Sequence, residues 1–349
     1  MMKFPMSGWW QKAGMVFAFL STSVPAGATP VLVVDTATRQ VLYQEDAGVP
    51  WYPASTTKLM TALVVFEALR SGEVTLSTPV TMTRNATKQA FLESGLTYGR
   101  TMTLEDALFA AITASANDVA VALAEAVAPN EASFVERMNR QAVRLGMTGT
   151  HFSSPNGLFD RNNYTTARDL AILGMEVEKL FPEYRRFFAA TAVVIDGKEI
   201  KSNNALLTSF SGTIGMKTGF LCASGRNYVG LATRNGRSVM VVLMGATTER
   251  ERNERSAQYL TQAFEGRFAG SGPVDGVQNR RDVAPEDMRI RLCTPKGAAY
   301  EASRDALYPM GLPGHESYLT DHLPEQVHEV RTWPGADTAD VPKPSQRRS

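Results

Sequence analysis

Two predicted β-hairpins, far apart along the chain, most constrain what this sequence can fold into. In the first, short β-branched or aromatic runs at 31–34 and 41–43 flank a polar segment. In the second, runs at 227–232 and 239–244 flank Asn235-Gly236, and an Asn-Gly pair is the strongest short signal for a tight hairpin turn. We therefore expect an antiparallel sheet that is assembled from both ends of the chain.

The chain between the hairpins is predicted to be helical. Residues 55–71 carry apolar side chains at helical spacing, and Thr103-Leu104-Glu105-Asp106 joins a side-chain cap to early acidic residues that suit the helix dipole. Further helices are expected at about 103–113, 117–127, 131–145, 167–179 and 249–268. A sheet built from both chain ends around a helical insertion indicates an α+β fold, with the active site where the sheet meets the helices.

Ser55 and Lys58 belong to the first of three polar motifs. Ser55 falls at or near a predicted helix N-terminus, and Lys58, three residues later, shares its helical face. A serine hydroxyl needs an adjacent base to be a good nucleophile, and a lysine amine can serve if its pKa falls from about 10.4 to about 7 or 8. We interpret Ser55 as the nucleophile and Lys58 as the base. The alternative is that Ser55 only caps the helix and Lys58 is solvated.

The second motif, Ser115-Ala116-Asn117, lies at the junction of two predicted helices, where a connection would present polar side chains to a cleft. Ser115 could pass a proton toward a leaving amine, and the Asn117 amide could hold both Lys58 and a substrate carbonyl. The alternative is that Ser115 or Asn117 simply caps the helix that follows.

The third motif, Lys217-Thr218-Gly219, leads toward the second hairpin and is predicted to lie on an edge strand facing the helices. The lysine and threonine suit a substrate carboxylate, and Gly219 permits close approach of a substrate backbone. The backbone N–H groups of Ser55 and Phe220 could form an oxyanion hole. An ordinary turn with an exposed lysine is the alternative. Together the three motifs supply the polar groups that a lysine-activated serine acyl-transferase requires.

Residues 1–28 have the pattern of a secretory signal peptide. Lysines accompany an apolar run at 13–20, and Ala26-Gly27-Ala28 is a small-x-small cleavage site. We expect a mature chain that begins at Thr29 and resides in the periplasm or outside the cell. The alternative is an uncleaved membrane-anchoring helix, although the apolar run is shorter than the ~20 residues that cross a bilayer.

The formal net charge of +1, without a basic run interleaved with aromatics, gives no indication of a nucleic-acid partner.

Two cysteines in an exported chain suggest a single disulfide. A bond between Cys222 and Cys293 would hold the C-terminal segment beside the active-site strand, and closing a loop of that size could contribute about 4 kcal/mol. Two separate buried thiols are the alternative.

The three motifs, their order and their spacing resemble those of the low-molecular-mass penicillin-binding proteins that are serine-type D-alanyl-D-alanine carboxypeptidases, relatives of the serine β-lactamases. The resemblance runs from about Thr29 to Phe268 and implies a β-lactamase/transpeptidase-like fold, with 29–268 as the catalytic domain. It extends to the segments around the motifs, at Tyr52–Thr61, Ser154–Leu158, Tyr164–Leu170, Asn203–Leu207 and Gly215–Phe220.

By this resemblance, Ser55 would attack the carbonyl between the two terminal D-alanines of a peptidoglycan stem pentapeptide. D-alanine would leave, and water would then release the acyl group from the enzyme. β-Lactam antibiotics would acylate the same serine and act as inhibitors. No cofactor and no metal ion are expected.

Two features depart from the family's pattern. Phe220 stands where one branch of the family carries histidine, so only its backbone N–H can be carried over. Residues 269–349 hold nine of the eighteen prolines and end in a polar tail, without the apolar stripe of an amphipathic helix. We therefore expect a partly disordered extension over 269–349, and no stable membrane anchor once the signal peptide is removed.

Three other functions use a similar scaffold. A class A β-lactamase is disfavoured because no glutamate between Glu125 and Glu199 stands in an E-x-x-L-N segment. A D,D-endopeptidase that acts on cross-links would use the same groups, and the motifs do not separate it from a carboxypeptidase. A non-catalytic muropeptide-binding protein would be expected to lack the serine or one of the lysines, and this chain retains all of them.

Overall fold

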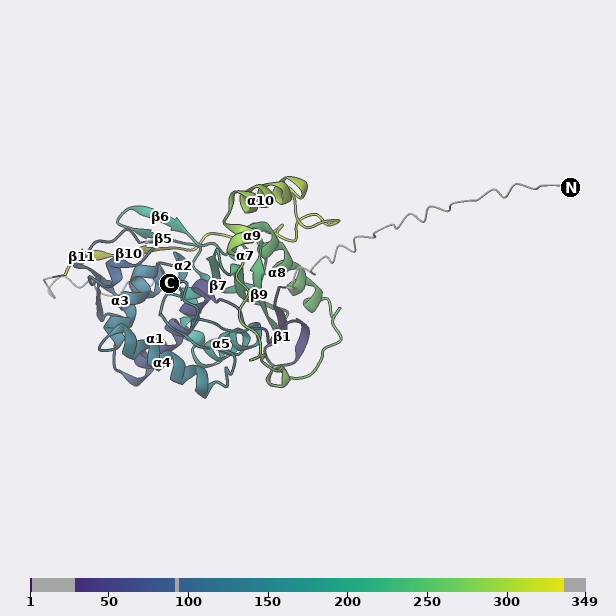
Figure 1. Cartoon of the computed structure of the whole chain (residues 1–349). Coiled ribbons are helices and arrows are strands. Elements are labelled where there is room, and N and C mark those ends of the chain that lie inside the picture. The colour runs from purple at the N-terminus through teal and green to yellow at the C-terminus, as the bar shows by residue number, and fades with distance from the viewer. Residues whose placement is uncertain (2–28, 92–93, 336–349) are drawn as a thin grey trace.

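A computed structural model describes residues 1, 29–91 and 94–335 of the chain (Figure 1). The expected signal peptide, apart from Met1, and the last residues of the expected C-terminal extension, 336–349, lie outside the described residues. In the described part of the chain, every helix is too short or too polar to cross a membrane.

A five-stranded antiparallel sheet joins the two ends of the region from 29 to 268, and its order is β2-β1-β9-β8-β7. Its strands are β1 (Val31–Asp35), β2 (Val41–Glu45), β7 (Thr213–Leu221), β8 (Gly225–Arg234) and β9 (Arg237–Ala246). Asn235 and Gly236 turn β8 into β9 with φ angles of 50° and 77°, as a tight primed turn requires. The expected sheet is confirmed, and β7, which carries the third motif, lies at its edge.

Helices cover both faces of this sheet, because alternate residues of each strand point to opposite sides. Leu32 and Val34 of β1 join the core shared with the helical insertion, whereas Val31 and Val33 join a second core. Figure 1 shows the insertion helices gathered on one side of the sheet and α8 on the other. The long helices are α1 (Lys58–Ser71), α2 (Leu104–Thr113), α3 (Asn117–Val127), α4 (Glu131–Arg144), α5 (Ala167–Leu180) and α8 (Glu249–Phe264).

Threonine side chains begin three of these helices. Thr103 accepts a hydrogen bond from the Asp106 backbone N–H at the start of α2, and equivalent caps begin α5 and α8. The predicted helix at 249–268 is too long by four residues. The helix α8 ends at Phe264, because Gly266 adopts a left-handed φ of 70° that terminates the helix.

Short elements complete the fold. They are η1 (Ala54–Thr57), η2 (Ala86–Lys88), η3 (Pro182–Tyr184), η4 (Val274–Gly276), α6 (Arg186–Ala189), α7 (Leu206–Ser209), α9 (Arg289–Leu292), α10 (Pro295–Leu307), β3 (Pro79–Thr81), β4 (Arg100–Thr103), β5 (Ala192–Ile195), β6 (Lys198–Lys201), β10 (Val327–Val330) and β11 (Thr332–Pro334). Two three-stranded sheets have the orders β10-β5-β6 and β11-β4-β3.

The segment after Phe268 packs on residues 29–268 through strands within 269–335. Strand β10 pairs with β5 in parallel, and β11 pairs with β4 in antiparallel fashion. Val330 and Trp333 of these strands are buried. The expected extension over 269–349 therefore includes a structured part, and its pattern of prolines does not reveal these strands.

Candidate active site

The Ser55–Lys58 pair lies where the short helix η1 leads into α1, as the sequence predicts. Lys58 is fully buried, so the alternative of a solvated lysine is wrong. Its Nζ donates hydrogen bonds to Ser55 Oγ at 3.0 Å, to Asn117 Oδ1 at 2.8 Å and to the Asn156 carbonyl oxygen at 2.8 Å. This network points the amine at the serine oxygen, which is the geometry that proton transfer between them requires.

Ser115 and Asn117 lie in the connection between α2 and α3 and at the start of α3. Ser115 adopts a φ of 60°, an unusual value for a residue with a side chain. Its Oγ accepts a hydrogen bond from Lys217 Nζ at 3.0 Å, while Asn117 also donates to the Phe91 carbonyl oxygen at 3.1 Å. The second motif therefore connects the lysine of the first motif to the lysine of the third.

Lys217 is buried on β7, and its Nζ also donates to the Thr218 carbonyl oxygen at 3.1 Å. Burial lowers the pKa of Lys217 to about 7, with a smaller contribution from the positive charge of Arg252. Arg252 is only 2% exposed and donates to the Asn203 carbonyl oxygen at 2.6 Å. Burial also lowers the Arg252 pKa, to about 10. The basic side chains of Lys217 and Arg252 thus lie at the end of the site that contains Thr218.

The edge strand β7 packs closely against the backbone that carries Ser55. A Cβ atom on Gly219 would lie 3.0 Å from the Ser55 backbone nitrogen, so a larger residue would push β7 away. Asn227, on the neighbouring strand β8, donates to the carbonyl oxygens of Tyr52 and Pro53 at 2.9 and 3.0 Å. These contacts hold the segment before Ser55 in place against the sheet.

A cavity of about 530 Å³ opens in front of Ser55. Its lining contains six of the eight predicted catalytic and substrate-binding residues: Ser55, Ser115, Asn117, Thr218, Gly219 and Phe220. The other two, Lys58 and Lys217, are buried and hydrogen-bond to the lining residues Ser55 and Ser115. The Phe220 side chain is 46% exposed, and the Arg226 guanidinium lies 4.7 Å from its ring centre. The structure therefore brings all eight residues together; their roles remain predictions.

Three contributors were not assigned a role from the sequence: the Asn156 carbonyl, Asn227 and Arg252. The sequence of Ser154–Leu158 shows only a similarity to the family, and a backbone carbonyl carries no side-chain signal. Arg252 lies on a helix rich in polar residues, and the sequence does not distinguish it from the other arginines there, so its burial is visible only in three dimensions.

Cys222 and Cys293 form a disulfide bond, with their Cα atoms 5.6 Å apart. The bond joins residue 222, at the end of β7 and in the lining of the cavity, to the segment between α9 and α10. Two separate thiols, the alternative considered from the sequence, are not what the structure shows.

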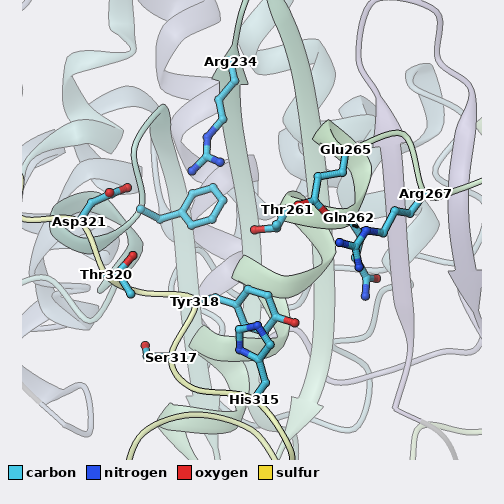
Figure 2. Close-up of a pocket in the computed structure, with 11 residues that line it drawn as sticks. Arg234, Thr261, Gln262, Glu265, Arg267, His315, Ser317, Tyr318, Thr320 and Asp321 are labelled. Atoms are coloured by element: carbon cyan, nitrogen blue, oxygen red, sulfur yellow. Dashed lines mark ion pairs between the residues drawn. The ribbon is translucent and has the colours of Figure 1, made fainter.

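A second cavity of about 530 Å³ lies between α8 and the segment at 315–321 (Figure 2). The Arg234 guanidinium lies 4.0 Å from the ring centre of Phe210. The rings of His315 and Tyr318, both labelled in Figure 2, stack at 3.8 Å. The only serine in its lining, Ser317, donates to a Glu254 carboxylate oxygen at 2.5 Å. The lining holds no lysine that could activate a serine, so the cavity at Ser55 is the candidate active site.

This chain is similar to known proteins in sequence and in fold. The family model described as D-alanyl-D-alanine carboxypeptidase matches residues 20–248. The D-alanyl-D-alanine carboxypeptidase DacF of Bacillus subtilis is 30% identical over 242 residues, which cover 68% of this chain and 62% of the relative. This chain therefore spans less than two thirds of that relative's length.

Solved structures show the same fold. Penicillin-binding protein 5 from Haemophilus influenzae is 30% identical with a TM-score of 0.64, over 68% of this chain and 71% of that one. A penicillin-binding protein from Listeria monocytogenes, in its ampicillin-bound form, is 29% identical with a TM-score of 0.63, over 68% and 97%. Because the family model matches more than half of the chain and the site motifs fall inside the match, this protein belongs to the D-alanyl-D-alanine carboxypeptidase family of penicillin-binding proteins.

Proposed function

We propose that this protein is a serine-type D-alanyl-D-alanine carboxypeptidase that removes the terminal D-alanine from peptidoglycan stem pentapeptides. The observation that carries the proposal is the buried Lys58 amine 3.0 Å from Ser55 Oγ, held by Asn117 and the Asn156 carbonyl. Burying a lysine is costly in free energy unless its hydrogen bonds are satisfied. A buried lysine that is held against a serine therefore indicates a functional site rather than a purely structural contact.

In the proposed acylation, neutral Lys58 takes the Ser55 proton as Oγ attacks the carbonyl of the penultimate D-alanine. The carbonyl oxygen becomes negatively charged and accepts hydrogen bonds from the backbone N–H groups of Ser55 and Phe220. Ser115 passes the proton that Lys58 took from Ser55 on to the leaving amine, the carbon–nitrogen bond breaks, D-alanine departs, and Lys58 is neutral again. Water then attacks the ester on Ser55 with Lys58 again as the base.

The substrate carboxylate is proposed to bind at the Thr218 end of the cavity. Lys217 and Arg252 place positive charge there, and the Thr218 hydroxyl adds a donor. The only carboxylate in the described lining, Glu249, lies 3.6 Å from the Arg252 guanidinium as an ion pair. No lining carboxylate is therefore left to activate a deacylating water, which favours slow release of β-lactams over antibiotic hydrolysis.

β-Lactams are proposed inhibitors that acylate Ser55, in keeping with the ampicillin-bound relative. The site of action is proposed to be the periplasm or the cell exterior, with a mature chain from Thr29. These two proposals rest on the pattern of residues 1–28 and on the peptidoglycan substrate, which lies outside the cytoplasmic membrane.

The test incubates the mature protein and its Ser55→Ala variant with a stem pentapeptide and follows the products by mass spectrometry. We expect loss of one terminal alanine with the wild type only, and covalent labelling by a fluorescent penicillin with the wild type only. Binding of the peptide without any loss would instead support a muropeptide-binding protein. Cleavage of cross-linked dimers at a comparable rate would show endopeptidase action in addition.

A further inference from the structure

Residues 286–307, which contain α9 and α10 and are called the arm below, contact residues that line the cavity but lie outside its three motifs. The arm is joined to the end of β7 by the Cys222–Cys293 disulfide. Beside that bond, the buried Met288 donates its backbone N–H to the Ala223 carbonyl oxygen at 3.0 Å. In Figure 1, α9 and α10 form a small helical lobe at the upper edge of the molecule.

A second contact of the arm orients a residue that lines the cavity. The Arg226 guanidinium makes a two-pronged ion pair with the Glu301 carboxylate of α10, at 3.1 and 3.4 Å. Both side chains are mostly buried, with exposures of 17% and 23%. The same guanidinium lies over the Phe220 ring. Glu301 therefore fixes Arg226, and Arg226 in turn supports the ring that forms one wall of the cavity.

A third contact of the arm reaches a second part of the cavity wall. The Arg289 guanidinium of α9 lies 4.5 Å from the ring centre of Phe159, and that ring packs edge-on against Tyr52 at 5.2 Å. Phe159 directly follows Gly157 and Leu158, which line the cavity. The arm thus holds both the Phe220 wall and the loop at 157–159.

The position of these walls identifies which part of a substrate they face. The proposed carboxylate site is at Lys217 and Thr218, and Phe220 lies two to three residues further along β7, roughly 7–10 Å away. A peptide whose C-terminal carboxylate binds at Thr218, and whose scissile carbonyl is at Ser55, must extend its acyl portion toward Phe220 and residue 222. A small acyl group would end before the walls that the arm holds.

We propose that the arm is a substrate-positioning element that favours stem peptides extending beyond the terminal D-alanyl-D-alanine. Its ligand class is the peptide chain on the N-terminal side of the scissile bond, held between the Phe220 ring and the loop at 157–159. The inference rests on the proposed carboxypeptidase function. It adds that the enzyme prefers long substrates and that the arm is the cause of this preference.

The test compares Glu301→Gln with Asp305→Asn in the full mature protein. Asp305 is a matched control, because it also lies on α10 and pairs with an arginine, Arg250, that does not line the cavity. Each variant is assayed with a stem pentapeptide, with N-acetyl-D-alanyl-D-alanine, and with benzylpenicillin acylation. We expect Glu301→Gln to raise KM for the pentapeptide about tenfold with kcat within about twofold, as loss of uniform binding predicts.

The short dipeptide and benzylpenicillin should react with Glu301→Gln as with the wild type, and Asp305→Asn should match the wild type throughout. A Cys222→Ser/Cys293→Ser double variant should show the same dependence on substrate length, more strongly. Equal losses with all three reagents would overturn the inference, since the arm would then only support the fold; so would an unchanged pentapeptide KM. A wild-type protein that reacts with none of the reagents would refute the proposed function and the inference together.

Discussion

At the residue scale, Gly157 is the position whose substitution should most directly disturb the nucleophile. It has a φ of +83°, and a Cβ atom there would lie 2.0 Å from the Ala54 carbonyl oxygen, next to Ser55. We expect Gly157→Ala to displace η1 and to slow acylation by a fluorescent penicillin about 100-fold, because small misplacements of reacting groups cost that much. The same change should lower the free energy of unfolding by about 3 kcal/mol.

Gly72→Ala is the control for backbone strain alone. Gly72 has a similar φ of +77°, but nothing lies within 4 Å of the position its Cβ would take. We expect it to cost about 1 kcal/mol in urea unfolding and to leave the acylation rate unchanged. Equal acylation rates for the two variants would contradict the role of Gly157.

Lys217 should impose a pH dependence on substrate capture. Its pKa in the folded protein is about 7, lowered mainly by burial, so the free enzyme loses this positive charge as the pH rises through about 7. Because kcat/KM reports the free enzyme, we expect kcat/KM for the pentapeptide to fall above about pH 7. A bound carboxylate would raise the Lys217 pKa, so the corresponding decline of kcat should occur at higher pH.

The Lys217→Arg variant provides the test, since a guanidinium stays charged across the measured range. We expect its kcat/KM to lack the decline near pH 7. The same shift has a stability consequence of the opposite sense: the unfolded chain binds this proton up to about pH 10.4, so the contribution of Lys217 to stability rises between about pH 7 and pH 10.4. A wild-type kcat/KM that stays flat to pH 9 would refute the assignment.

At the element scale, His328 fastens strand β10 to helix α2. Its Nε2 lies 2.7 Å from an oxygen of the mostly buried Asp106, and its ring stacks on Phe109 at 3.7 Å. We expect His328→Ala to lower the free energy of unfolding by about 2 kcal/mol, because Asp106 loses a partner and Phe109 loses a ring contact. Urea denaturation measures the loss.

His315→Ala also removes an imidazole, but from an exposed ring that stacks on Tyr318. We expect a change within about 0.5 kcal/mol, as is usual at exposed positions. If the two histidine variants had the same free energy of unfolding, the contact between β10 and α2 would not contribute to stability.

Local signals explain which elements the sequence could predict. Thr103 marks the start of α2 and Asn235-Gly236 marks a hairpin turn, and both signals are read within a few residues. Strands β10 and β11 have no such signal, because they are short and half exposed and their partners β5 and β4 are distant in sequence. For the same reason the motif side chains of the site were predictable, but the Asn156 carbonyl and the buried Arg252 were not.

At the scale of the whole molecule, residues 269–335 are part of the folding unit. They supply four buried apolar side chains to its main core, those of Val274, Met288, Leu292 and Val330, and Trp333 is also buried. Each such side chain contributes up to about 1.5–3 kcal/mol through burial. Domains of ordinary stability unfold at a net cost of only about 5–15 kcal/mol, so losing the whole segment should remove most of that margin.

We therefore expect a chain of residues 29–268 to unfold at far lower urea concentration than one of residues 29–335, or to be recovered only as aggregate. The shorter chain keeps all eight site residues and every strand of the main sheet, so motif content alone predicts equal labelling by a fluorescent penicillin. The structure predicts that labelling of the shorter chain falls with its folded fraction, because β5, β4 and α2 each lose one packing partner. Equal unfolding midpoints for the two chains would show that the unit ends at Phe268 after all.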